Sequence, residues 1–193
     1  MGTIVKPKVG LTPKEWANVA YQAFSGGLDL VKDDENLVDQ EFCRWESRLH
    51  EVVKSIDKAG KETGQNHLYS SNISDRYSRM VERLETLNGM GVQKNVIVML
   101  DTYVMGMGAL QDILELCRKY GFATHGHRAG FAGPNRGNFG INFQIYEKFY
   151  RLLGIDQLHI GTGVGKMEGA PAMIRRLHDI ADKQKIEEKM YLG

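Results

Sequence analysis

Short apolar runs alternate with longer amphipathic stretches along the chain. The clearest run, residues 96–100, is apolar and rich in β-branched side chains, as suits a strand buried on both faces. The runs predict strands over residues 3–5, 28–31, 67–69, 96–100 and 157–160, and another that opens at residues 122–124. The stretches between them carry apolar residues at helical spacing and predict helices over residues 13–25, 41–60, 74–90, 109–120, 139–153 and 172–189.

The first of these helices has a defined start. Thr12 is suited to cap it, Pro13 fits the first helical position, and Glu15 completes a capping box. The stripe expected to face the core is Trp16, Val19, Ala20 and Ala23. The same spacing predicts that Phe42 and Tyr77 face the core from the next two helices.

Strict alternation of strand and helix predicts an α/β fold with a parallel sheet, either a doubly wound sheet or a (β/α)8 TIM-type barrel. A doubly wound sheet gathers its polar loops at one switch point, whereas a barrel has its chemistry at the carboxyl ends of many strands. Lys6, Lys32, His127 and His159 each come at the end of a predicted strand. The sequence therefore favours a barrel with about six of its eight units, forming one partial barrel domain over residues 1–193.

Composition sets the broad class of protein. The 193 residues include 42% hydrophobic residues, and 25 Lys+Arg against 24 Asp+Glu give a formal charge of +1. These values suit a globular protein, argue against disorder, and give no electrostatic case for binding nucleic acid or an anionic membrane. No apolar run approaches the roughly 20 residues that span a bilayer. The distant Cys43 and Cys117 match no metal spacing and predict reduced, buried thiols in a cytoplasmic protein.

The segment over residues 26–35 is the first candidate for chemistry. An apolar strand runs directly into Lys32 and the three acids that follow it. Carboxylates such as Asp34 and Glu35 are hard oxygen ligands suited to Mg²⁺. An ammonium group would repel the metal, but a neutral Lys32 amine can react with CO2 to form a carbamate, which is a third oxygen ligand. The alternative is a solvated charge cluster after a strand.

Two further groups carry candidate side chains. Lys6 and Lys8 bracket a proline that fixes the turn, so they could hold a phosphate or an enolate, or remain solvated. Alternation along a strand sends His125 and His127 to the same side, and Arg128 is suited to grip a phosphate. No cysteine or third histidine is near them in the sequence, which argues against zinc, and a structural pair of histidines is the alternative.

The glycine-rich segment over residues 159–169 is the fourth group. It resembles a phosphate-binding loop, but Met167 stands after Lys166 where that motif requires Ser or Thr. What remains is a loop carrying one lysine after a strand. Such loops can close over a substrate and exclude water, and an ordinary surface loop is the alternative.

Together these four groups resemble the large chain of ribulose-bisphosphate carboxylase (rubisco) in their order and spacing. The matching segments are residues 2–10, 26–37, 125–129 and 159–169. Gly126, Gly130 and Phe131 indicate the archaeal branch of the family. The resemblance implies a cytoplasmic lyase that uses Mg²⁺ to enolise and carboxylate ribulose 1,5-bisphosphate to 3-phosphoglycerate, with CO2 or O2 as second substrate.

The resemblance also implies roles for individual residues. Lys32 matches the lysine that activator CO2 carbamylates, with Asp34 and Glu35 as the other Mg²⁺ ligands, and the carbamate would remove the C3 proton. The other matches are Lys6 as the proton shuttle at C2, His127 as an acid/base, Lys166 on the closing loop, Thr3 and Lys8 as substrate contacts, and Arg128 and His159 around one phosphate.

One departure is Phe131, which stands where plant-type enzymes carry a histidine, so the hydrogen bonding around His127 is open. The family's N-terminal domain and last two barrel units are also missing from this sequence. An inactive, incomplete barrel that only folds and self-associates is therefore an alternative to the carboxylase. A rubisco-like enolase is a second one, although retention of Lys166 favours carboxylase ancestry. Because an open barrel exposes two strand edges, we expect a homo-oligomer that covers them.

Overall fold

The computed structural model describes residues 1–161 together with residues 175 and 178. Six parallel strands form one sheet in the order β1-β2-β3-β4-β5-β6. The strands are β1 (Gly2–Ile4), β2 (Leu30–Lys32), β3 (Leu68–Asn72), β4 (Val96–Asp101), β5 (Thr124–His127) and β6 (Gln157–Leu158). A doubly wound sheet would reverse its order at a switch point, so the sequential order confirms the predicted barrel type, with six strands in the described residues.

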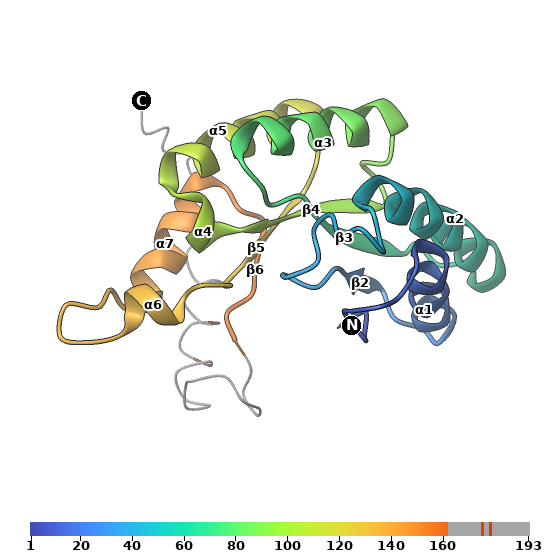
Figure 1. The fold of residues 1–193 in the computed structure, drawn as a ribbon, viewed down its shortest axis with the longest axis horizontal. Coiled ribbons are helices and arrows are strands. Elements are labelled where there is room, and N and C mark those ends of the chain that lie inside the picture. Colours follow the sequence, from blue (N-terminus) through green and yellow to red (C-terminus); the bar gives the residue numbers. More distant parts are fainter. Residues whose placement is uncertain (162–174, 176–177, 179–193) are drawn as a thin grey trace.

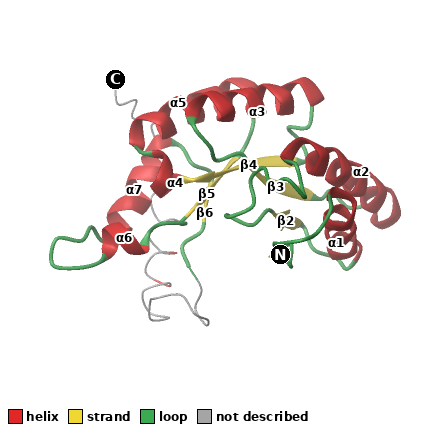
Figure 2. Ribbon diagram, viewed as in Figure 1, coloured by secondary structure: helices red, strands yellow, loops and turns green. Residues whose placement is uncertain are grey.

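The helices lie on the outer side of this curled sheet (Figures 1 and 2). They are α1 (Pro13–Ser25), α2 (Trp45–Thr63), α3 (Tyr77–Met90), α4 (Thr102–Met105), α5 (Met107–Tyr120), α6 (Ala132–Asn135) and α7 (Phe143–Leu153). The predicted last helix, residues 172–189, has only residues 175 and 178 within the described part of the chain. The helical layer covers one face of the sheet and leaves the other to line the barrel interior.

Helix α1 forms as its sequence predicts. The Thr12 side chain accepts from the backbone N–H of Glu15, and the Glu15 carboxylate accepts from the Thr12 backbone N–H at 2.8 Å, which completes the capping box. The buried residues are Trp16, Ala17, Ala20 and Phe24. Val19 and Ala23 are only partly buried, because the face that packs on the sheet lies slightly to one side of the predicted stripe.

Helices α2, α3 and α7 begin later than the sequence predicts, at residues 45, 77 and 143 instead of 41, 74 and 139. Helix α2 begins at Trp45, whose backbone N–H donates to the Asp39 carboxylate at 2.9 Å, and Phe42 is 39% exposed in the loop before it. Helix α7 begins at Phe143, after Asn142 caps it through the N–H of Gln144. Tyr77 was predicted to be buried but is 43% exposed, because it is the first residue of α3.

The main hydrophobic core lies between the sheet and its helices. Alternate residues of β4, namely Val96, Val98 and Leu100, point into this core. Cys43 and Cys117 are free and buried, as predicted. Since successive side chains of a strand face opposite ways, the residues between them face the barrel interior, where polar side chains end several strands.

A buried ion pair fixes the loop after β2. The Arg48 guanidinium on α2 grips Asp33 through Nε–Oδ1 at 3.0 Å and Nη2–Oδ2 at 3.2 Å, and both side chains are almost fully buried. Arg48 also donates to the carbonyls of Val38 and Cys43, each at 2.9 Å. The hydroxyl of Tyr69 donates to the same Asp33 carboxylate. A single carboxylate thus connects β2, β3 and α2.

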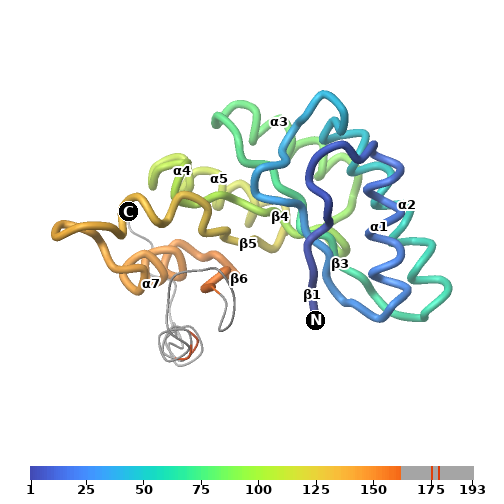
Figure 3. Tube along the Cα trace, turned by 60° about the horizontal axis from the view of Figure 1, so that its bottom comes forward, coloured from blue at the N-terminus to red at the C-terminus, as the bar shows by residue number. Residues whose placement is uncertain are grey.

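The sheet ends in two unpaired edges within the described residues. β1 pairs only with β2, and β6 pairs only with β5. Figure 3 shows β1 and β6 on the two sides of the curled row of strands. Among the described helices, none combines the length and the apolar character that crossing a membrane requires.

We expect Arg48→Met to lower the free energy of unfolding by about 3–5 kcal/mol, because it leaves the Asp33 charge buried without its partner. Arg79→Met is the matched control. Arg79 pairs with Glu82 on the exposed side of α3, where solvent screening leaves such a pair little effect on stability. Denaturant unfolding of both variants measures the difference, and equal losses would contradict the role assigned to the buried pair.

Candidate active site

The polar residues that end the strands come together at one rim of the sheet. Lys32 ends β2, Asn72 ends β3, Asp101 ends β4 and His127 ends β5. Asp101 and His127 are partners in the register of β4 and β5. Parallel strands bring their carboxyl ends to the same edge, so residues far apart in sequence share this rim.

The segment after β2 is packed rather than solvated. The Asp34 carboxylate is fully buried and accepts from Lys6 Nζ at 2.5 Å and from the Asn36 backbone N–H at 2.9 Å. The Lys32 side chain is 13% exposed; its Nζ donates to the Asp33 carbonyl at 3.1 Å and lies 3.9 Å from Glu35 Oε2. The alternative of a solvated charge cluster does not fit this packing.

Burial and hydrogen bonds shift the pKa values of Lys32 and Asp34. Burial lowers the pKa of Lys32 below its usual 10.5, although the neighbouring carboxylates of Glu35 and Asp34 oppose the change. Burial raises the pKa of Asp34, but hydrogen bonds from Lys6 and Asn36 outweigh it and leave that pKa below its usual value. The pocket therefore makes the Lys32 amine easier to deprotonate than a solvated lysine, and it favours the ionised carboxylate of Asp34.

His127 faces both the β2 loop and β4. Its Nδ1 accepts from the backbone N–H of Ala129 at 3.1 Å, which assigns the proton of the neutral ring to Nε2. Nε2 lies 3.7 Å from Glu35 Oε2, and Nδ1 lies 3.5 Å from Asp101 Oδ1. The backbone of Ala129 thus orients the ring, and Phe131, whose position left this bonding open, takes no part in it.

The histidines of the rim are held neutral. Burial and then the charge of Lys32 lower the pKa of His127 to about 3. Burial lowers the pKa of His125 to about 4, although its hydrogen bond to Gln157 opposes the change. The ring centroid of His127 lies 6.4 Å from that of His125 and 5.1 Å from that of His159. Both histidines of β5 therefore face the same side, as alternation predicts.

The remaining predicted residues differ in how the structure places them. Arg128 donates to the Ile160 carbonyl at 2.7 Å, and its guanidinium lies 4.1 Å from the ring centroid of Phe131. Thr3 and Lys8 are exposed. Lys166 and residues 162–169 of its glycine-rich loop lie outside the described residues. The structure therefore links Lys6, Lys32, Asp34, Glu35, His127 and His159 by direct contacts, and it shows no such contact for Thr3 or Lys8.

Two polar residues of the rim, Asn72 and Asp101, are not identified as site residues from the sequence. Asn72 donates to Asp101 Oδ2 at 3.4 Å, and Asp101 Oδ1 has no hydrogen-bond partner among the described residues. Burial raises the pKa of Asp101 to about 6, and the charge of Glu35 adds to this effect. A signal for Asp101 was present, because it directly follows the apolar run of β4 just as Lys32 follows that of β2.

The donor set suits a hard divalent cation only if Lys32 contributes to it. Among the described residues, no group of three or more His, Cys, Asp and Glu side chains is placed to hold a metal ion. Asp34 and Glu35 supply carboxylate oxygens, and a carbamate on Lys32 would supply the third anionic oxygen donor. These three groups fit the oxygen chemistry of Mg²⁺, which needs few protein ligands.

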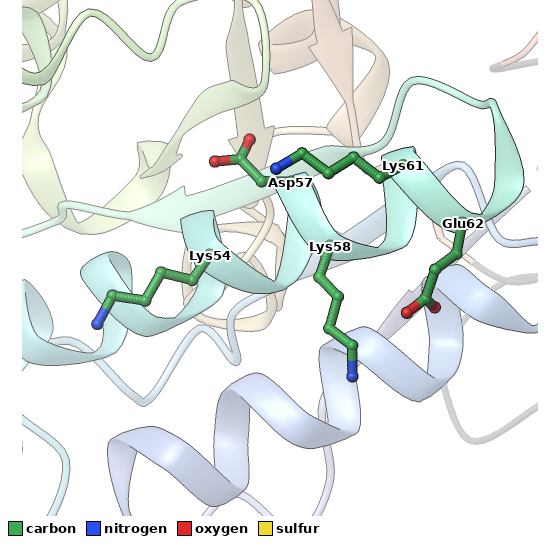
Figure 4. A pocket seen from close by; sticks show the side chains of 5 residues that line it. All are labelled: Lys54, Asp57, Lys58, Lys61 and Glu62. Atoms are coloured by element: carbon green, nitrogen blue, oxygen red, sulfur yellow. The ribbon is translucent and has the colours of Figure 1, made fainter.

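Two surface hollows lie elsewhere. One, of about 500 Å³, opens between α4, α6 and α7 and has mainly apolar walls. The other, of about 380 Å³, is lined by Lys54, Asp57, Lys58, Lys61 and Glu62 of α2 (Figure 4). There Lys58 Nζ lies 4.0 Å from the ring centroid of Tyr21, whose hydroxyl donates to Glu62 at 2.6 Å. These two charges therefore serve the packing of α1 against α2.

The curled parallel sheet, its sequential strand order and its polar rim define the class of protein, the catalytic portion of a TIM-type α/β-barrel enzyme. The family model described as "Ribulose bisphosphate carboxylase large chain, catalytic domain" matches residues 1–193. The chain belongs to the family of ribulose bisphosphate carboxylase large chains, an enzyme family. The family predicted from the sequence is confirmed.

Archaeal enzymes are among its most similar relatives. The ribulose bisphosphate carboxylase of Methanocaldococcus jannaschii is 46% identical over 188 residues, which cover 97% of this chain and 43% of the relative. The dimeric archaeal rubisco from Hyperthermus butylicus matches with a TM-score of 0.83 at 39% identity, covering 93% of this chain and 41% of that one. The octameric rubisco from Pyrococcus horikoshii matches with a TM-score of 0.85 at 39% identity, covering 92% and 42%. This chain spans less than half the length of these relatives.

The buried imidazole of His125 makes stability depend on pH. Its pKa of about 4 lies below the usual 6.5, so between these values the unfolded chain binds more protons. The free energy of unfolding therefore falls as the pH drops, by up to about 1.4 kcal/mol per pH unit from this group. We expect His125→Asn to flatten the slope between pH 7 and pH 5, as measured by denaturant unfolding. Equal slopes in the two proteins would contradict a buried neutral ring.

Proposed function

We propose that this chain is the catalytic barrel portion of a ribulose-bisphosphate carboxylase, which enolises and carboxylates ribulose 1,5-bisphosphate to 3-phosphoglycerate. The observation that carries the proposal is the convergence of Lys6, Lys32, Asp34, Glu35 and His127 at one rim. Lys6 contacts Asp34, while Lys32 and His127 both face Glu35. In the proposed protein, residues 1–193 form part of one barrel domain.

Lys32 is the residue that activates the site in this proposal. Its lowered pKa makes the amine easier to deprotonate, and the deprotonated amine attacks CO2 to form an N–C bond. The nitrogen then releases one proton to solvent to give the carbamate. The carbamate, Asp34 and Glu35 would hold Mg²⁺. When bound, this metal supplies Lewis-acid stabilisation of negative charge on the substrate. Asp34 is already ionised, because Lys6 and Asn36 hold its pKa low.

The other rim residues handle protons and phosphate. In this proposal Lys6 shuttles protons at C2, and the Lys32 carbamate accepts the C3 proton. His127 offers its Nε2–H to a substrate oxygen, because its Nδ1 is already used by the Ala129 N–H. The contacts to the substrate ends come from Thr3, Lys8, Arg128 and His159, and Lys166 faces the incoming CO2.

We expect Lys32→Ala and Lys32→Arg to abolish any conversion of ribulose 1,5-bisphosphate, CO2 and Mg²⁺ to 3-phosphoglycerate. Neither alanine nor arginine forms the carbamate, although arginine keeps the positive charge. Lys54→Ala, on the exposed side of α2, is the matched control and should leave turnover unchanged. Product formed by either Lys32 variant would reject the carbamate role.

The same assay separates the carboxylase from an inactive, incomplete barrel. Two observations favour that alternative for the isolated chain: β1 and β6 are unpaired at one edge among the described residues, and the chain spans less than half the length of its relatives. Robust turnover by the wild-type chain would exclude it. Absence of product, together with a ¹³CO2-derived carbamate on Lys32, would show that the site forms its carbamate but does not bind the substrate productively.

We also propose that the chain forms a homo-oligomer that covers the edges of β1 and β6. Unpaired strand edges invite pairing with another chain. The named relatives include a dimeric and an octameric rubisco. We expect light scattering to report a mass above 21.8 kDa that increases with concentration. A monomer at high concentration would contradict this proposal.

A further inference from the structure

Asn72 contacts both halves of the rim from a fully buried position at the end of β3. Its side-chain amide donates to the main-chain carbonyl of Glu35 at 3.2 Å and to Asp101 Oδ2 at 3.4 Å. Its backbone N–H donates to Asp33 Oδ2 at 2.9 Å. One residue therefore connects the loop after β2 with the end of β4.

The orientation of this amide is fixed by a local turn. Asn72 Oδ1 accepts from the backbone N–H of Ser74 at 2.9 Å, and Ser74 Oγ accepts from the backbone N–H of Asp101 at 2.8 Å. Because the oxygen is engaged by Ser74, the amide NH2 must face Glu35 and Asp101. Both donor hydrogens then have acceptors across the rim.

The groups that Asn72 holds are the ones that face the proposed chemistry. The Glu35 carboxylate lies 3.9 Å from Lys32 Nζ and 3.7 Å from His127 Nε2. Asp101, held by its Oδ2, presents Oδ1 at 3.5 Å from His127 Nδ1. A shift of the Asn72 side chain would therefore move the β2 loop and Asp101 relative to His127.

We propose that Asn72 is a positioning residue for the carboxylase reaction. Its hydrogen bonds hold the Glu35 main chain and the Asp101 carboxylate in place next to Lys32 and His127. This inference rests on the proposed function, in which Glu35 is a Mg²⁺ ligand. Removing a residue that hydrogen-bonds to a metal ligand commonly changes metal affinity by 10- to 100-fold.

Asn72→Ser is the sharpest variant. A serine hydroxyl can still accept from the Ser74 N–H in the local turn, but it is too short to reach Glu35 or Asp101. Asn95→Ser is the matched control, because Asn95 Nδ2 donates to Asn66 Oδ1 at 2.9 Å and to the His67 carbonyl at 3.1 Å at the opposite end of the same strands. Both variants lose bridging hydrogen bonds between β3 and β4, but only one loses them at the rim.

The measurement is the ¹³C NMR signal of the carbamate formed from ¹³CO2, recorded while Mg²⁺ is titrated into the chain. We expect Asn72→Ser to raise the Mg²⁺ concentration at half-maximal signal about tenfold or more. Asn95→Ser should titrate like the wild type, with an unfolding midpoint as low as that of Asn72→Ser. If the serine variant fails to fold, Asn72→Thr replaces it, since its hydroxyl can also accept from the Ser74 N–H, it adds no charge, and its β-branched side chain suits a strand.

The outcomes separate the two proposals. No carbamate signal in the wild type would overturn the proposed Mg²⁺ site and, with it, the role of Asn72. A wild-type signal with an unchanged titration in a folded Asn72 variant would overturn the positioning role alone. Equal shifts in the Asn72 and Asn95 variants would also overturn it, because the effect would then follow general stability.

Discussion

All six strands run in the same direction, and the rest of the molecule depends on this constraint. It sends every carboxyl end to one rim, so each strand can contribute its last inward side chain to a shared site. Lys32, Asn72, Asp101 and His127 meet there although 95 positions separate the first from the last (127 − 32 = 95). The hydrophobic core lies on the other side of the sheet, between the strands and the helices. Polar residues at the rim therefore do not disrupt its apolar packing.

Three consecutive acids after β2 have different roles because their side chains point in different directions. Asp33 points toward the helices, where Arg48 neutralises it and Tyr69 donates to it. Asp34 and Glu35 face the rim, next to Lys6 and His127. The buried Asp33–Arg48 pair anchors the loop to α2. The loop therefore holds the carboxylates of Asp34 and Glu35 close together although they repel each other. Structural and chemical charges are thereby kept on opposite faces of one short segment.

Much of the fold could be predicted because its signals are local. The capping box at Thr12 and the apolar run of β4 each specify an element without reference to the rest of the chain. The site could be predicted as far as it follows strand ends, as with Lys32 and His127. Asn72 was missed because the weak third run indicates a strand over residues 67–69, whereas pairing with β4 extends β3 to residue 72. Arg48 was missed because a charged residue on a helix is ordinarily solvated, although it lies three residues after Trp45 and four before Val52 on the buried stripe. Only tertiary packing supplies Asp33, the partner that allows its burial.

The sequential strand order also bears on how the chain can fold. Each strand in the described sheet hydrogen-bonds to the strand that precedes it along the chain, so every pairing closes a short loop. Each pairing therefore loses only the loop-closure entropy of one βα unit. Growth from the N-terminus needs no partner that has yet to be synthesised, and a nascent chain can add units in the order in which the ribosome releases them.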